Sequence, residues 1–298
     1  MACCILPCLT YANEAVGAGT TSGAVENDTG KVDANEAVDA STLPGAVANN
    51  TSEAEADENS VTIKVGFDQT AGKYGTNRTS SSLSVPVTLS YDTDNYDVSL
   101  TVPYLMQTGP AGRIAGKPVL ASGANKIVTE SGLGDVIGAV TRDLMSDDES
   151  GFDVDVGASI KFATADQSKG LGTGKDDYSV QIDVYQDYDT FGLSGTVGYS
   201  VLGSPGRVVV NGIQQNIILN NVFYGSAGAT YKISEMTTAG LMYDIQQPYE
   251  TGGYEQKDIM ANLKFKANSS TRLRIYALKG LADGNPDWGS GASVSASF

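Results

Sequence analysis

The segment 152–162 has the sequence FDVDVGASIKF, in which apolar and polar residues alternate along the whole length. A period of two is typical of a β-strand whose two faces differ in polarity. One face of this strand would carry two phenylalanines and four aliphatic side chains, and the other would carry Asp153, Asp155 and Lys161. A soluble core cannot bury three ionised groups on one strand face without close partners. We therefore expect the apolar face to contact lipid and the polar face to line an aqueous lumen.

The same alternation returns at regular intervals from Ser60 to the last residue. It predicts twelve strands, near 60–69, 80–91, 95–106, 133–145, 152–165, 177–187, 190–202, 219–232, 236–247, 256–267, 270–280 and 288–298. A strand of a soluble protein has about five or six residues, whereas a tilted strand that crosses a membrane needs about 9–11. The lengths of the predicted strands therefore favour crossing a membrane.

Short and long connections alternate along this region. The short ones lie near 93–94, 188–189, 234–235 and 268–269, and the long ones at 70–79, 107–132, 166–176, 203–218, 248–255 and 281–287. Bacterial outer-membrane barrels alternate in this way, with short turns in the periplasm and long loops outside the cell. An even number of strands predicts that both termini lie in the periplasm.

The final predicted strand alternates from Trp288 to Phe298 and stops there. We interpret the closing Phe298 as the signal that the barrel-assembly machinery of a Gram-negative bacterium recognises. The predicted fold is all-β, a transmembrane antiparallel up-and-down β-barrel of about 12 strands in the outer membrane, surrounded by outer-membrane lipid. The alternative fold is a soluble β-sandwich whose last strand ends in phenylalanine.

Charged residues on the predicted inner faces divide by sign. What we call the acidic wall comprises Asp97, Asp153, Asp155 and Asp183. What we call the basic wall comprises Lys64, Lys264, Lys266, Arg272 and Arg274. In a ring of twelve strands the two walls would face each other and set a field across the lumen. The alternative is an internal network of salt bridges that closes a narrow lumen.

Composition limits the function classes. The net charge of −16 argues against a nucleic-acid partner. The chain contains no histidine, which removes the imidazole that most proton-transfer catalysis uses. Its three cysteines lie within the first eight residues. We therefore expect no enzyme activity, no cofactor and no metal site.

Two segments precede the predicted barrel. Residues 1–12 contain a short apolar run, which we interpret as the remnant of a signal peptide. Residues 13–59 form an acidic low-complexity arm. Between positions 13 and 60 the sequence contains ten acidic residues and only one basic residue, a lysine. Such a segment buries too little apolar surface to offset the entropy of ordering it.

The arm contains a 22-residue repeat in two copies, of which ANEAV at 12–16 and 34–38 is the clearest part. One interpretation is a plug, a tether or an arm that binds a periplasmic protein partner. The other is a duplicated disordered spacer.

Three sets of motifs from 131 onward resemble one known family. They are SGLGDV at 131–136, KFATAD at 161–166 followed by GLGTG at 170–174 and DY at 177–178, and LKGLADGNPDWG at 278–289. Together they resemble the outer-membrane transporter-like family named for the MetA pathway of phenol degradation. Ala163 and Ala296 depart from its pattern, where proline and an aromatic residue are expected. The resemblance implies a barrel with a transport role.

The sequence thus predicts an outer-membrane channel for the passive transport of small solutes, with apolar aromatic compounds as one candidate class. One alternative is a secretion channel for a protein substrate, of the type that exports functional-amyloid subunits, in which the arm at 13–59 acts as gate or recruiter. Another is a closed structural barrel.

Overall fold

The computed structural model describes residues 59–93, 95–111, 126–147 and 150–298. The predicted signal-peptide remnant, the acidic arm and its repeat therefore lie outside the described residues, except for Asn59. No helix in the described ranges is long and apolar enough to cross a membrane.

The described residues form thirteen long strands and one separate hairpin. The strands are β1 (Asn59–Gly72), β2 (Ser80–Thr93), β3 (Tyr96–Pro110), β4 (Ile127–Leu133), β5 (Val136–Asp147), β6 (Phe152–Phe162), β7 (Asp177–Asp187), β8 (Phe191–Val201), β11 (Val222–Ser234), β12 (Thr237–Gln246), β13 (Gln256–Lys266), β14 (Thr271–Gly280) and β15 (Trp288–Ser297). The hairpin consists of β9 (Gly206–Val210) and β10 (Ile213–Ile217), and η2 (Gln167–Lys169) is a 3-10 turn.

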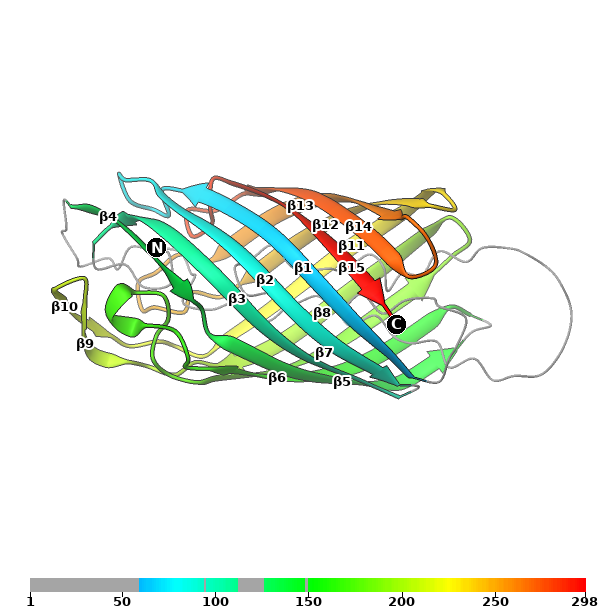
Figure 1. The fold of residues 1–298 in the computed structure, drawn as a ribbon, viewed down its shortest axis with the longest axis horizontal. Helices are drawn as coiled ribbons and strands as arrows, with labels where there is room; N and C mark the ends of the chain where they lie inside the picture. The colour runs from blue at the N-terminus through cyan, green and yellow to red at the C-terminus, as the bar shows by residue number, and fades with distance from the viewer. Residues whose placement is uncertain (1–58, 94, 112–125, 148–149) are drawn as a thin grey trace, which may run out of the picture.

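Every neighbouring pair of barrel strands is antiparallel, and the sheet closes on itself (Figure 1). The order runs β1, β2, β3, then β4 and β5, then β6, β7, β8, β11, β12, β13, β14 and β15, which pairs with β1 again. The strands β4 and β5 share one position, because β4 pairs with the last part of β3 and β5 with its first part. The described residues thus form a ring of twelve wall positions, which confirms the predicted fold class.

The two faces of the sheet differ as the alternation predicted. In β1 the polar residues Thr62, Lys64 and Asp68 are buried, whereas Ile63 and Phe67 between them are exposed. The same contrast recurs around the ring, and large apolar side chains cover the outside. A soluble monomer does not expose an apolar surface of this extent. The closed backbone and the apolar exterior are what a bilayer requires of a spanning structure.

The barrel has two unlike ends. One end, which we call the turn end, carries the short connections between β7 and β8, β11 and β12, and β13 and β14. The opposite loop end carries the long connections and the hairpin (Figure 1). Residues Val61 and Phe298 exchange backbone hydrogen bonds of 3.2 and 2.9 Å, so β1 begins and β15 finishes together at the turn end.

The structure corrects four element boundaries. Residues 107–132, expected as one loop, include the end of β3 and all of β4 except its last residue, Leu133. The strand expected at 133–145 is interrupted at Gly134-Asp135, the strand expected at 152–165 ends at Phe162, and the strand expected at 219–232 begins at Val222. The polar sequence of β4 gave no alternation, and its pairing with β3 depends on backbone hydrogen bonds instead.

The expected loop 203–218 is largely the hairpin of β9 and β10. Its turn is Asn211-Gly212, and both residues have positive φ, 51° and 79°. Two residues in this conformation match the twist of an antiparallel pair, and Asn-Gly is a strong sequence signal for such a turn. That signal was present in the sequence, between two runs of β-prone residues.

Candidate functional site

The candidate site is the inner surface of the barrel, and the acidic wall lies on it. Asp97, Asp155 and Asp183 are buried on the inner faces of β3, β6 and β7, and Asp153 is half-buried on β6. Asp155 and Asp183 lie directly opposite each other on neighbouring strands. The structure therefore brings these two predicted residues together.

The basic wall is also inside the barrel. Lys64, Lys264, Arg272 and Arg274 are buried, and Lys266 is half-buried. Strand pairing places Lys264 opposite Arg274 and Lys266 opposite Arg272. Ser295 of β15 lies opposite Arg272 on one side and opposite Lys64 on the other. The basic residues of β13, β14 and β1 are therefore near neighbours.

In the ring, β13 and β14 are separated from β6 by about half of the wall positions in either direction. By contrast, Lys64 on β1 is only two positions from Asp97 on β3, so the order of strands does not separate every member of the two walls. The field between them and its effect on ions remain a prediction.

One donor from the neighbouring strand β8 and one from its own strand β7 hold the side chain of Asp183. The hydroxyl of Thr196 donates to its Oδ1 at 2.6 Å, and Nε2 of Gln181 donates to its Oδ2 at 2.6 Å. The phenol of Tyr224 donates in turn to Oε1 of Gln181 at 3.1 Å. A linked set of polar side chains therefore covers the inner face of β7, β8 and β11.

Two inward-facing tyrosines lie against glycines. A side-chain carbon at Gly198 would collide with the ring of Tyr224, and one at Gly291 would collide with the ring of Tyr276. The phenol of Tyr276 also donates to Oδ1 of Asp68 at 2.5 Å. The absence of a side chain on these inner positions lets an aromatic ring lie flat on the wall.

Lys161 forms the centre of a buried charge cluster near the loop end. Its Nζ lies 3.0 Å from Oδ2 of Asp135 and 2.5 Å from Oδ2 of Asp177, and all three side chains are buried. The other carboxylate oxygen of each aspartate accepts a hydrogen bond from the backbone of a loop. Oδ1 of Asp135 accepts from the amide of Ala165 at 2.9 Å, and Oδ1 of Asp177 accepts from the amide of Gly203 at 2.6 Å. This cluster thus fixes the loops after β6 and β8 to the wall.

The loop at 166–176 folds inward and packs on the wall. Leu171 is buried against Ala165 and the inward-facing Leu105 of β3. Gly170 and Gly174 have φ of 73° and 68°, which side chains rarely adopt, so glycine at these positions allows the tight turns of this segment. Asp166 caps η2, and the hydrogen bond from Ser168 lowers the pKa of its carboxyl group.

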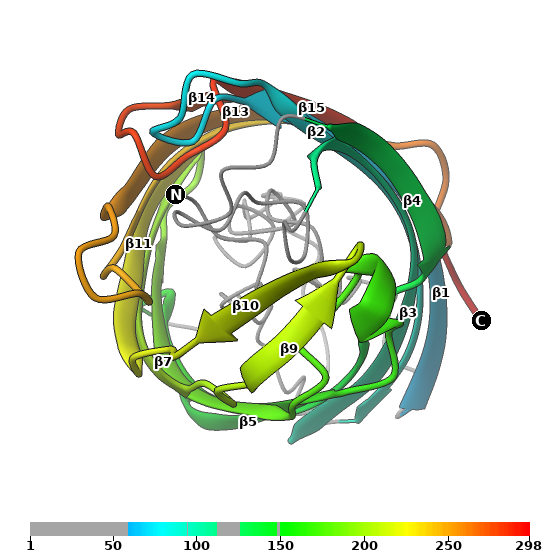
Figure 2. The ribbon, with the colours of Figure 1, turned by 90° about the vertical axis from the view of Figure 1, so that its left-hand side faces the viewer.

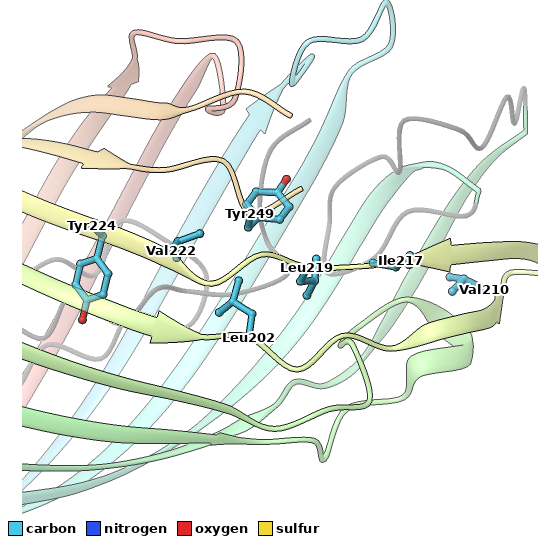
Figure 3. Packing of buried hydrophobic residues seen from close by; sticks show 7 residues of the cluster. All are labelled: Leu202, Val210, Ile217, Leu219, Val222, Tyr224 and Tyr249. Carbon is cyan, nitrogen blue, oxygen red and sulfur yellow. The ribbon is translucent and has the colours of Figure 1, made fainter. Parts of the chain in front are cut away.

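The hairpin of β9 and β10 lies across the ring at the loop end (Figure 2). Val210 and Ile217 belong to a buried apolar cluster whose other members are Leu202, Leu219, Val222, Tyr224 and Tyr249 (Figure 3). The amide of Asn211 donates to the carbonyl oxygen of Ser168 at 2.9 Å, which joins the hairpin to the inward loop. Together the two segments cover part of the mouth.

Sequence reasoning missed the cluster around Lys161, although its members occur in the quoted motifs at 131–136, 161–166 and 177–178. It also missed Asp143, which lies directly opposite Asp155 on β5. Both omissions have one cause, because a strand pattern gives the face of a residue but not its register with the next strand. Among the described residues there is no group of three or more histidines, cysteines or acids arranged to hold a metal ion.

No protein-family model and no curated protein matches the chain. Among solved structures, the chain is similar to an outer membrane channel from Pseudomonas putida F1, with a TM-score of 0.60, 10% identity, and coverage of 80% of this chain and 95% of that one. It is also similar to the β domain of the Bordetella autotransporter BrkA, with a TM-score of 0.50, 12% identity, and coverage of 80% and 99%. At such identities the similarity is one of fold, and the fold is that of an outer-membrane β-barrel.

Proposed function

We propose that this protein is an outer-membrane channel for the passive transport of small solutes. The observation that carries the proposal is the contrast between the two faces of one closed barrel, apolar outside and both polar and charged inside. A barrel of this size is intermediate between small filled barrels and open porins. Ionised side chains along its interior favour an aqueous path.

The solute class that we propose includes small apolar aromatic compounds. In addition to the polar residues, the inner face presents the rings of Tyr185, Tyr224 and Tyr276, which are buried within the barrel. Aromatic rings combine a large apolar surface with a polar group, which suits passage of solutes that carry both. We also propose that the turn end faces the periplasm and the loop end faces the outside.

Single-channel conductance in a planar bilayer tests the proposal, with swelling of proteoliposomes in small sugars and in benzoate as the solute assay. A channel gives discrete conductance steps and swelling above that of empty liposomes. A barrel that resists unfolding in detergent yet gives neither signal would overturn the proposal and favour the closed structural barrel.

The basic wall gives a separate prediction about selectivity. Replacing Arg272 and Arg274 by serine removes two buried positive charges from the lumen, so we expect the reversal potential in a KCl gradient to shift towards cation preference. The control is Arg142→Ser, which removes one positive charge from an exposed position where the guanidinium lies 5.5 Å from the ring of Tyr96. An unchanged reversal potential in the double variant, with the barrel folded, would exclude the proposed field across the lumen.

A further inference from the structure

A groove of about 750 Å³ lies on the outer face of the barrel and crosses β2, β3, β5, β6 and β7. We call it the outer groove. Its large side chains are apolar, exposed and directed outward, and they include Leu89, Tyr91, Leu100, Phe162 and Tyr178. The outer groove is therefore a hollow in the surface that faces lipid, and it is separate from the lumen.

Two small residues create this hollow. Gly138 of β5 and Ala158 of β6 stand at outward positions of the wall. Strand pairing places the larger Leu100 on one side of Gly138 and Ile160 on the other. A side-chain carbon added at Gly138 would be in ordinary van der Waals contact with the ring of Phe162, at 3.5 Å. The floor of the outer groove can thus accept further atoms.

The outer groove is long enough to hold an extended chain. One row of paired residues along it runs through Leu89, Leu100, Gly138, Ile160 and Tyr178. The four steps of this row, about 4.8 Å each, cover roughly 19 Å of wall. Leu89 lies in the half of β2 nearer the turn end, whereas Tyr178 is the second residue of β7 and lies at the loop end. The outer groove therefore leads from the turn-end half of the barrel towards the loop end.

A positive charge lies beside the turn-end part of the outer groove. Arg142 of β5 is exposed on the outer face, two residues beyond Val140, which lines the groove. Its guanidinium carbon lies 5.5 Å from the centre of the ring of Tyr96, the first residue of β3 after the short turn from β2. Tyrosines are common where barrel strands leave the apolar layer. Among the described residues no carboxylate forms an ion pair with Arg142.

The guanidinium of Arg142 is suited to binding a phosphate. A guanidinium that stacks on a ring keeps N–H donors along its edge, and two such donors match two oxygens of one phosphate. A charge on a lipid-facing surface is costly unless it reaches the headgroup layer or finds a partner there. A glycerophospholipid supplies that partner, because its phosphate lies only a few bonds from its acyl chains.

We propose that one glycerophospholipid binds at this place, with its phosphate on Arg142 and one acyl chain in the outer groove over Gly138 and Ala158. The proposal goes beyond the channel function and does not depend on conduction. The orientation proposed above places the turn end in the periplasm, and the periplasmic leaflet of the outer membrane consists of such lipids. The head and the chain each have a defined partner here, which distinguishes this lipid from the rest of the lipid around the barrel.

Native mass spectrometry of the full-length protein tests the proposal, with dioleoylphosphatidylethanolamine titrated into the refolded barrel in detergent. For the wild-type protein we expect one lipid to be retained per barrel. In Arg142→Gln we expect the dissociation constant to rise by about tenfold, equivalent to roughly 1.4 kcal/mol from a charge-assisted contact. Dioleoylglycerol has the same chains without the phosphate, so it should bind more weakly and should not respond to the substitution. Inorganic phosphate alone should not displace the lipid.

A second pair of substitutions tests the acyl chain. Gly138→Leu with Ala158→Leu fills the outer groove and should also weaken retention of the lipid. The matched control is Gly195→Leu with Ala227→Leu, since these small residues are paired on the outer face of β8 and β11. Arg142→Gln changes one exposed side chain, so it tests the proposal even if the leucine variants fail to fold.

Two outcomes would overturn the lipid site. One is that Arg142→Gln binds the phospholipid as tightly as the wild-type protein. The other is that both leucine pairs weaken binding equally, which would indicate a general effect of the outer surface. A barrel that binds the lipid but conducts no ions would refute the channel function and leave the lipid site standing.

Discussion

Removal of the hairpin of β9 and β10 should increase the conductance of the barrel. Residues 206–217 lie across the ring at the loop end (Figure 2), so a variant in which two glycines replace them should pass at least about twofold more current if the mouth limits the flow. The measurement is single-channel conductance of the folded variant. An unchanged conductance would show that the hairpin does not limit the path.

Point substitutions give a finer form of the same experiment. Val210 and Ile217 are buried in the apolar cluster, and each side chain contributes about 1.5–3 kcal/mol by leaving water. Val210→Ser with Ile217→Ser should therefore release the hairpin and produce frequent openings to the higher level. The matched control replaces Val209 and Ile218, which are their neighbours but are 58% and 64% exposed, and should leave the current trace unchanged.

Replacement of Lys161 by methionine should cause the largest loss of stability in the barrel. The substitution leaves the buried carboxylates of Asp135 and Asp177 without their cation. Breaking a buried ion pair in this way costs about 3–5 kcal/mol. The single tryptophan, Trp288, reports unfolding by denaturant through its fluorescence. Trypsin should also cleave faster at Lys169, because the cluster holds the loop that contains this residue.

Lys257→Met is the matched control for that experiment. Lys257 pairs with Glu255 at 2.5 Å, but both side chains are substantially exposed. Water screens an exposed pair of this kind, so its loss should change the stability of the barrel little. Equal losses of stability in the two variants would contradict the assigned role of the Lys161 cluster.

The strands were predictable because each one carries its own signal. The alternation in 152–162 depends only on contact with lipid on one side and water on the other. It can therefore be recognised in the sequence without knowing which strands lie beside it. The turn at Asn211-Gly212 was also a local signal, and expecting a plain loop there was an error of interpretation. By contrast, β4 has no alternating pattern. Backbone pairing with β3 holds this strand, and such pairing leaves no pattern in the sequence of the strand itself.

The sites were less predictable than the strands, because they depend on register. The sequence places Asp155 on the inner face but cannot show that Asp143 and Asp183 lie directly beside it. In the same way, Lys161 is separated by more than ten residues along the chain from both Asp135 and Asp177, and only the fold brings the three side chains together. A one-residue change in register would turn a whole strand over and disperse both clusters.

The pairing of β15 with β1 has a consequence for how the barrel forms and how long it lasts. The hydroxyls of Thr62 and Ser297 are 2.9 Å apart although 235 positions separate them in the chain. Contacts between such distant residues form slowly, because a long loop must close first. Until this seam forms, β1 and β15 each present an unpaired edge to other chains. Once it has formed, unfolding must separate a full row of backbone hydrogen bonds at once, so the lifetime of the barrel is set by a kinetic barrier.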